Sequence, residues 1–560
     1  MTGARSGDQA ADDDSASGRR DSADDASKDS SKRDAKGSAK DSQQWRPKSN
    51  PWLIAVVVTL AAFMEVLDST IVNVALPHIS GSMSSSYDEA TWTLTSYLVA
   101  NGIVLPLSAF FSRWLGRKRY FVLCIAAFTV CSLLCGLSTQ LWQLILFRIL
   151  QGFFGGGLQP IQQSVILDTF EPSQRGKAFA VSAVAIVVAP VLGPTLGGLI
   201  TDNFSWRWVF LINVPIGILT VIAVMQFVED PPWERRAKKG SLSVDYIGIG
   251  LIAIGLGCLQ VMLDRGEDDD WFGSGFIITF AALAVVGLVG ATFWLLYAKK
   301  PVVNIRVLKD RNFAIGSAVI AGFAMILYGS SVLIPQLAQQ QLGYTATLAG
   351  LVLSPGAIAV TLIIPLISRA MPYVEARYIV ATGFFLLGCA MLYCTRLIPD
   401  IDYTTLVLMR SSQSAAIAFL FVPVTTLAYL SLPKQLNGDA SALFTMFRNV
   451  AGSIGISLST ALVTERTQVQ MAHANEHMSP FSANYQNTLQ QIQLTLESAG
   501  QTAAQAAQQA SGYMYQTFIK QSTILAYIDI FSFCAIFAFC FVPLSFFFSS
   551  SKPSGESGGH

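Results

Sequence analysis

The chain has 560 residues and a formal net charge of +1 at pH 7, with 52% hydrophobic residues and only 13% charged ones. Its mean hydropathy is +0.48. A soluble core cannot absorb so much apolar sequence, so the composition excludes a soluble globular protein. It predicts an all-α polytopic membrane protein instead.

The first segment, residues 1–49, consists largely of Asp, Ser, Lys and Arg. Such a segment cannot offset the entropy of its own ordering, so we expect a disordered cytoplasmic tail, with a docking segment as the alternative. It lacks the apolar region of a secretory signal, and membrane insertion is therefore expected to begin with the first transmembrane helix.

From Trp52 onward, apolar runs recur at about the twenty residues that a helix needs to cross the hydrocarbon of a bilayer. We predict fourteen spans, at 52–77, 92–112, 120–138, 141–167, 178–200, 207–228, 244–262, 273–297, 313–338, 348–368, 378–397, 405–432, 441–463 and 522–548.

The links between these spans differ in charge. If residue 1 is cytoplasmic, the inward links carry most of the Lys and Arg, including "GRKR" at 116–119. This asymmetry predicts that both termini are cytoplasmic, which an even number of spans allows. As a short inward link, 116–119 is not read as a nucleic-acid patch.

An internal repeat divides the chain. "RILQGFFGGGLQP" (148–160) and "RSSQSAAIAFLFVP" (410–423) both have Arg-x-x-Gln followed by a proline, and they fall at the same place in two sets of six helices. Two related halves place transport sites at their interface. The predicted parts are two six-helix halves (50–230 and 301–550), a linker with two inserted helices (231–300) and a cytoplasmic tail (551–560).

Several motifs carry a family resemblance. The first span has the complete pattern L-D-x-T-x-x-N-x-A-L-P at 67–77, the fifth has G-P-x-x-G-G at 193–198, and "WRWVFLINVPIG" opens the sixth. The sequence thereby resembles the fourteen-span drug:proton antiporters of the major facilitator superfamily, the EmrB/QacA group, and in particular its Gram-negative EmrB type. The resemblance implies the major facilitator fold, a site in the bacterial inner membrane, and transport driven by the proton gradient without a cofactor.

The link between the second and third spans departs from the superfamily pattern. Gly116, Arg117 and Lys118 are kept, but Ala109 and Arg113 stand where a glycine and an acidic residue are usual. This departure calls into question the gating ion pair that the acidic residue usually provides.

Two carboxylates, Glu65 and Asp68, interrupt the first span. An ionised carboxylate at mid-bilayer costs about 2.5–3.5 kcal/mol, and the i, i+3 spacing places both on one face. Repulsion and desolvation disfavour two negative charges there, so at least one can load and release a proton. The resemblance makes Asp68 the coupling residue. For Glu65, a proton site and a helix–helix hydrogen bond remain equal alternatives.

Three further charges lie within spans: Arg148, Asp529 and Arg448. A buried guanidinium needs a partner, and we expect a carboxylate of the first span to pair with Arg148, as a switchable or a static ion pair. Asp529 is interpreted as a second protonation site, a substrate counter-charge or an interfacial hydrogen-bonding group. Arg448 is expected to snorkel or to cap its helix.

The motif residues Gly193, Pro194, Gly197 and Gly198 are expected to allow close helix packing and a bend, because proline removes a backbone hydrogen bond. The resemblance implies that this bend controls outer closure, and packing alone is the alternative. Gly116 and Arg117, in the link between the second and third spans, are further candidate residues for gating or packing.

The substrate site is predicted as a central, mostly apolar cavity with few polar anchors. Chosen by depth, its candidate residues are Gln151, Gln163, Tyr328, Gln413, Phe63 and Phe323. Such a lining suits varied lipophilic compounds that reach it from the cytoplasm or the lipid.

The outer segment 464–521 is rich in Ala and Gln, which predicts one or two helices outside the membrane. Gram-negative relatives work with a periplasmic membrane-fusion adaptor of the EmrA type and an outer-membrane channel of the TolC type. This segment is therefore a candidate docking surface, and a cover over the external mouth is the alternative.

These features together predict a proton-coupled multidrug efflux antiporter that works by alternating access. A dedicated exporter of one endogenous metabolite, siderophore or lipid shares the same motifs, and a non-transporting membrane sensor is a further alternative. No nucleophile–base set, phosphate loop or metal-ligand spacing is visible in the sequence, so an enzyme is not predicted.

Overall fold

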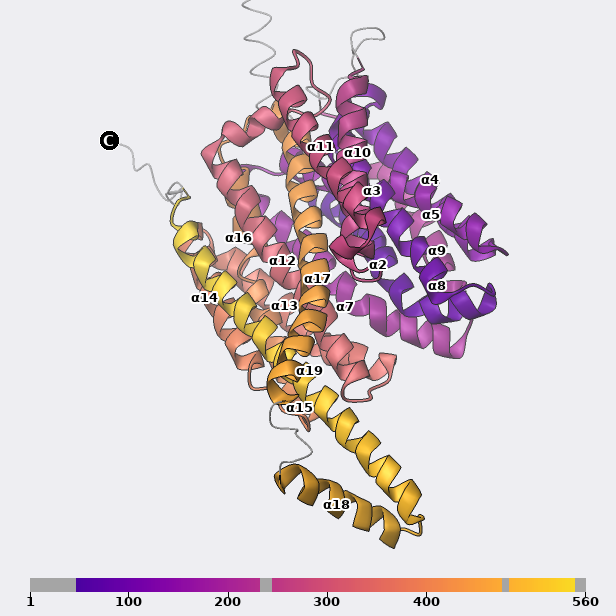
Figure 1. Cartoon of the computed structure of the whole chain (residues 1–560). Coiled ribbons are helices and arrows are strands. Elements are labelled where there is room, and N and C mark those ends of the chain that lie inside the picture. Colours follow the sequence, from indigo (N-terminus) through magenta and orange to yellow (C-terminus); the bar gives the residue numbers. More distant parts are fainter. Residues whose placement is uncertain (1–46, 232–243, 476–482, 549–560) are drawn as a thin grey trace, which may run out of the picture.

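The computed structural model describes residues 47–231, 244–475 and 483–548, and regular structure in these ranges is entirely helical (Figure 1). The α-helices are α2 (Pro51–Ser82), α3 (Tyr87–Leu115), α4 (Arg117–Leu137), α5 (Leu141–Gly155), α6 (Leu158–Thr169), α7 (Pro172–Asn203), α8 (Trp208–Leu211), α9 (Asn213–Phe227), α10 (Tyr246–Arg265), α11 (Gly275–Tyr297), α12 (Arg311–Gln340), α13 (Ala346–Ala370), α14 (Ala376–Cys394), α15 (Tyr403–Ile417), α16 (Phe421–Ala428), α17 (Asn437–Asn475), α18 (Ala483–Ser498) and α19 (Ala503–Ser545). Three short 3-10 helices are η2 (Trp271–Gly273), η3 (Ile305–Lys309) and η4 (Lys434–Leu436).

The number of membrane spans differs from the prediction. In the described ranges, 12 helical segments are long and apolar enough to cross a membrane, or 13 if the bent helix α7 is one span. The predicted span 441–463 lies in α17, which is not among these segments and carries Arg448 and many Ser, Thr and Gly residues. The all-helical membrane fold is confirmed, but the count of fourteen is not.

Two predicted spans are interrupted at matching places. The span 141–167 consists of α5 and α6, separated by Gly156 and Gly157, and the span 405–432 consists of α15 and α16. At Gly156 the backbone of α3 comes so close that an added Cβ would lie 2.6 Å from the carbonyl oxygen of Asn101. The two interruptions fall within the two repeated sequence stretches, as expected if the stretches are related.

The helices form two packed sets, and α10 and α11 lie between them in the view of Figure 1. Helices α2 to α9 belong to the first set and α12 to α19 to the second. The sets meet where α7 packs against α13 and where α3 and α6 pack against α17. Helix α10 packs mainly against α11, and also against α3 and α17, so the inserted pair lies beside this second contact between the sets.

The glycines of the motif in α7 allow a close contact with α2. A Cβ added at Gly193 would lie 2.1 Å from Oγ1 of Thr70, and one at Gly197 would lie 2.9 Å from the carbonyl oxygen of Ile71. The helix bends by 42° between the parts that end at Pro190 and begin at Leu192. The bend lies in the turn that precedes Pro194. A proline ring bends a helix there because it clashes with the carbonyl group four residues earlier.

The contact at Gly193 yields a stability prediction. Gly193→Ala is expected to lower the free energy of unfolding by about 1–3 kcal/mol, because the methyl group forces α7 away from α2. Gly250→Ala in α10 is the matched control, since a Cβ there has nothing within 4 Å. Thermal unfolding of the purified protein measures both, and equal melting temperatures would contradict the close contact.

The outer segment 464–521 contains more helix than a link needs. Helix α17 continues to Asn475, α18 follows, and α19 starts at Ala503 and runs on into the bundle. Figure 1 shows α18 and the first part of α19 projecting from the end of the molecule opposite to the start of α17. The predicted tails lie outside the described residues, except for 47–49.

Candidate functional site

A buried ion pair joins α2 to α5. Oδ2 of Asp68 lies 2.6 Å from Nη1 of Arg148, and both side chains are 0% exposed. Oδ1 of Asp68 accepts hydrogen bonds from Asn213 at 2.7 Å and Gln151 at 3.0 Å. The guanidinium also donates from Nε to the backbone oxygen of Thr93, at 3.0 Å. Arg148 therefore has the expected carboxylate partner, although the contact by itself does not test a coupling role.

The second carboxylate, Glu65, is held by neutral side chains. It accepts hydrogen bonds from Asn101 at 3.0 Å, from the Tyr97 hydroxyl at 3.4 Å and from the amide nitrogen of Gln159. The amide oxygen of Gln159 in turn accepts a hydrogen bond from Arg448 of α17. Glu65 is thus connected, through one glutamine, to the second set of helices.

The prediction that Arg448 snorkels or caps is wrong. Its side chain is among the largest fully buried ones, and the residue is 1% exposed. It lies where α17 packs against α6 and α12, so the guanidinium points into the interface between the helix sets and not toward an end of its helix.

Tyr97 connects the two carboxylate groups. The Cζ atom of Arg148 lies 4.0 Å from the centre of the Tyr97 ring, within the range of a cation–π contact, while the Tyr97 hydroxyl donates to Glu65. One continuous polar network results, from α2 and α5 through α3 and α6 to α17. Its members, in order, are Asp68, Arg148, Tyr97, Glu65, Gln159 and Arg448.

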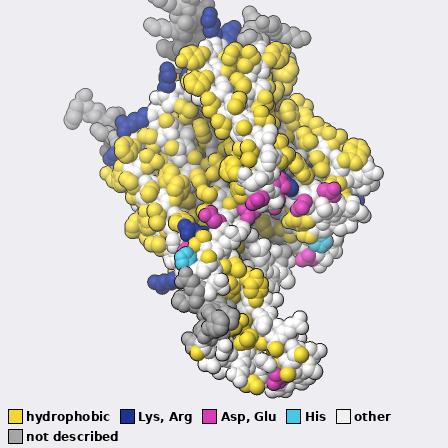
Figure 2. Space-filling view, viewed as in Figure 1, with side chains coloured by type: hydrophobic (Ala, Val, Ile, Leu, Met, Phe, Trp, Pro, Cys, Tyr) yellow, Lys and Arg dark blue, Asp and Glu magenta, His cyan; other side chains and the backbone are white. Residues whose placement is uncertain are grey.

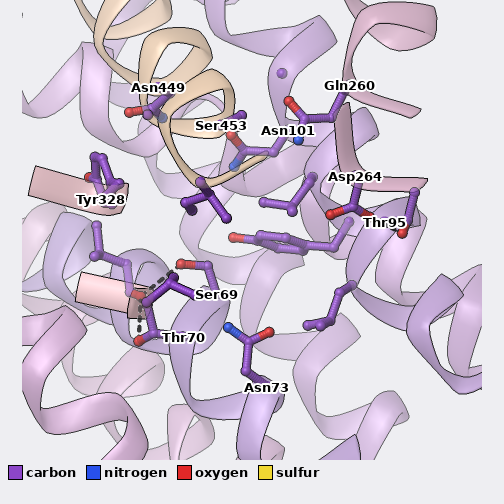
Figure 3. A pocket seen from close by; sticks show the side chains of 18 of the residues that line it. Ser69, Thr70, Asn73, Thr95, Asn101, Gln260, Asp264, Tyr328, Asn449 and Ser453 are labelled. Atoms are coloured by element: carbon purple, nitrogen blue, oxygen red, sulfur yellow. Dashed lines mark hydrogen bonds between the residues drawn. The ribbon is translucent and has the colours of Figure 1, made fainter. Parts of the chain in front are cut away.

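A cavity of about 510 Å³ lies beside this network. It is lined by residues of α2, α3, α6, α10, α12 and α17, and therefore by both helix sets and the inserted pair. Glu65 and Gln159 reach its wall. So do Asn101 of α3 and Tyr328 and Asn449 of the second set, which Figure 3 shows around the cavity. Because Glu65 touches both the cavity and the network, a ligand in the cavity and a proton on Glu65 would influence each other.

Among the six predicted substrate residues, the structure brings only Tyr328 to this cavity. The other five do not line this cavity, and their side chains are bonded or packed elsewhere in the helix bundle. Gln151 binds Asp68, Gln163 accepts hydrogen bonds from Tyr429 and Thr445, Gln413 binds Arg410 and Cys394, Phe63 packs beside Val66 and Leu67, and Phe323 packs on Phe421.

The second helix set contains a counterpart of the ion pair in which the partners of the buried arginine are neutral. Arg410 of α15 is buried like Arg148, and it donates to Gln413 at 3.0 Å and to the Ser330 hydroxyl at 3.1 Å. Ser330 thus takes the place of Asp68. Asp529 lies elsewhere, on α19, where it accepts a hydrogen bond from Gln470 at 2.9 Å. Its predicted protonation remains untested.

Polar contacts join the two sets at the end of the bundle where α3 ends and α17 begins. Arg113 of α3 lies 2.7 Å from Asp439 of α17. Nearby, Asp168 pairs with Arg117 and accepts a hydrogen bond from Asn437 at 2.8 Å. The sequence departure at Arg113 thus has an explanation, because the ion pair is present with the basic residue on α3. Gly116 ends α3 with φ of 90°, which favours glycine.

Sequence reasoning missed several polar residues of the site. Tyr97, Asn101 and Gln159 are neutral residues in apolar spans, and nothing in the spacing distinguishes them from helix-packing groups. Asn213 offered a signal, since it belongs to the "WRWVFLINVPIG" motif. Within the described ranges, no group of three or more His, Cys, Asp or Glu residues could hold a metal ion.

Comparison with known proteins gives the family. The model of the Major Facilitator Superfamily matches residues 58–456. The chain is 36% identical over 520 residues to the multidrug export protein EmrB of Escherichia coli K12, covering 92% of this chain and 99% of that protein. It is 34% identical over 506 residues to the fatty acid resistance protein FarB of Neisseria gonorrhoeae, covering 90% and 97%.

A solved structure agrees on the fold. The proton:xylose symporter XylE matches with a TM-score of 0.54 and 14% sequence identity, covering 88% of this chain and 96% of that one. At this identity the likeness concerns the fold alone. The sequence matches extend along most of the chain. They show that the chain belongs to the major facilitator superfamily and, within it, to the EmrB type.

Proposed function

We propose that this protein is a proton-coupled antiporter that exports lipophilic toxic compounds by alternating access. The observation that carries the proposal is the polar network from Asp68 to Arg448, because it joins two protonatable carboxylates to the contact between the helix sets. The printed name of the E. coli relative, a multidrug export protein, supports the same function. The proton gradient is the proposed energy source, without a cofactor.

The network suggests how protonation could change the conformation. A proton on Asp68 would weaken its ion pair with Arg148, whose guanidinium also stacks on Tyr97. A proton on Glu65 would weaken the attraction that reaches Arg448 through Gln159. Both changes loosen contacts next to the cavity, so protonation is proposed to favour release of the compound and separation of the helix sets.

The energy of the proton gradient is sufficient for such a cycle. One charge that crosses 100 mV is worth about 2.3 kcal/mol, and each pH unit adds about 1.4 kcal/mol per proton. With 100 mV and one pH unit together, one proton supplies about 3.7 kcal/mol, which corresponds to a concentration ratio of about 500 for the exported compound.

We propose an inner-membrane location with both termini in the cytoplasm. On the face shown in Figure 2, most Lys and Arg lie at the end where α10 begins, and Asp and Glu gather where α10 ends. The positive end would be cytoplasmic, because translocation of basic residues is unfavourable. The projecting α18 and start of α19 would then be periplasmic, available to an adaptor of the EmrA type that leads to a channel of the TolC type.

The test of this function is proton movement in everted membrane vesicles that hold an imposed pH gradient. Addition of lipophilic compounds that do not themselves carry protons through lipid, such as uncharged dyes and permanently charged lipophilic cations, is expected to release protons only from vesicles that contain the protein. If no compound moves protons while the protein is folded and inserted, the multidrug function is contradicted, and a dedicated exporter or a sensor becomes the better explanation.

A second candidate, export of one class of endogenous lipid, is favoured by the relative named for fatty acid resistance. It predicts that long-chain fatty acids collapse the gradient faster in vesicles that contain the protein than in vesicles that lack it, and that unrelated compounds show no such difference. A response to chemically unrelated compounds would decide for the multidrug function.

A further inference from the structure

The inserted helix α10 forms part of the cavity wall. Three side chains at its end face the cavity: Gln260 and Asp264 in the helix and Asp268 just after it. Figure 3 shows Gln260 and Asp264 opposite Asn101 and Thr95 of α3, with Ser453 and Asn449 of α17 nearby. The inserted pair is thus in a position to contact whatever enters the cavity.

Gln260 is a buried polar group without a partner. Its side chain lines the cavity and the residue is 9% exposed, yet its amide makes no hydrogen bond within the described ranges. The amide is open to the cavity, where its nitrogen can donate to a bound molecule and its oxygen can accept from it. A ligand that supplies a donor or an acceptor at this point would therefore bind more tightly than one that does not.

Asp264 is a carboxylate without a cation. It accepts a hydrogen bond from the Thr95 hydroxyl, and no ion pair joins it to a basic residue in the described ranges. Asp268 differs, because Arg265 lies 3.6 Å away. Glu65, the other carboxylate deep in the same cavity, is likewise held by neutral groups. The cavity wall therefore presents two carboxyl groups, Asp264 and Glu65, that make no direct ion pair with a basic residue in the described ranges.

We propose that α10 forms a binding subsite for the positively charged end of an amphipathic, lipophilic compound. Asp264 pairs with the positive charge, Gln260 hydrogen-bonds a polar group beside it, and the apolar body lies against Val332 and Ile456 of the second helix set. This inference rests on the proposed export function and specifies the substrate class. It also gives the inserted helices a role, which is to select cationic substrates.

The test compares two dyes on the purified, full-length protein by fluorescence polarisation. Ethidium is a lipophilic cation with amino groups, and Nile red is uncharged. Asp264→Asn is expected to weaken ethidium binding by about tenfold or more, since it removes the charge and keeps the shape, while Nile red binding changes by less than about twofold. Gln260→Leu is expected to weaken ethidium binding by about threefold or more.

Asp270→Asn serves as the matched control. Asp270 is exposed in the same link, lies outside the cavity lining, and has φ of 59°, which asparagine tolerates. It should bind both dyes as the wild type does. Asp264→Glu, which restores the charge, should recover most of the ethidium affinity.

The possible results separate the subsite from the export function. Unchanged ethidium binding in Asp264→Asn, or equal losses for both dyes, overturns the subsite and leaves the export function standing. If the wild type binds neither dye and moves no protons in response to either, both proposals are overturned together.

Discussion

Asp68→Asn is expected to reduce compound-driven proton release by more than about tenfold, while binding of a lipophilic dye is retained. Asparagine keeps the size of the side chain and an oxygen that can accept from Arg148, so the packing of α2 against α5 should survive. What is lost is the group that binds and releases a proton. The measurement is proton release from everted vesicles, with elution of the purified variant as a single species as the check of folding.

Two further substitutions sharpen this result. Glu65→Gln is expected to slow transport and to leave proton release detectable, because it removes the charge facing Gln159 but not the Asp68 pair. Asp529→Asn is expected to behave like the wild type, since its carboxylate is outside the network and binds only Gln470 among the contacts described. Full coupling in Asp68→Asn, or its loss in Asp529→Asn alone, would contradict the assignment.

The second large effect is expected at the ion pair between Arg113 and Asp439. Arg113→Asp places two negative charges together where α3 meets α17, and should lower the transport rate strongly by separating the helix sets at that end. Arg113→Asp combined with Asp439→Arg should recover part of the rate. A coupling energy of about 0.5–3 kcal/mol is typical of contacting residues in such a double-mutant cycle.

Recovery should be incomplete for a physical reason. Arg113 lies in the last turn of α3 and Asp439 in the first turn of α17, so the native charges suit both helix dipoles. The exchanged charges oppose both. Arg119→Asp is the control, because Arg119 is exposed in the first turn of α4, close in sequence to Arg113, and has no ion pair in the described ranges. Independent, additive effects of the two single substitutions would contradict a functional role for the ion pair between Arg113 and Asp439.

The sequence predicts the charged centre of the site better than its neutral surroundings. A guanidinium and a carboxylate buried in apolar spans require each other, so the contact between Arg148 and Asp68 could be expected without a structure. Gln159, Tyr97 and Asn101 carry no such requirement. Their meeting depends on how α3 and α6 rotate about their axes, and the spacing within either helix does not determine this.

The side chains whose positions the sequence did not predict have a physical feature in common. Position along a span gives the depth of a residue in the membrane, but not the direction in which its side chain points. Gln163 and Gln413 have a suitable depth and yet face neighbouring helices, and Arg448 points into the bundle. Asp264 could be noticed only as part of an acidic outer link, because its contact with Thr95 joins residues 169 positions apart.

Gln159 has a consequence for how fast the two helix sets can part. A carboxylate and a guanidinium in direct contact away from water form a contact that is costly to break. Here a neutral amide stands between Glu65 and Arg448, with its nitrogen toward the acid and its oxygen toward the base. Separation then requires the loss of one hydrogen bond and leaves each charge with other polar neighbours. In the proposed transport cycle, the glutamine would act as a spacer that keeps the opposite charges attracted across the interface, and the helix sets would part more easily than across a direct ion pair.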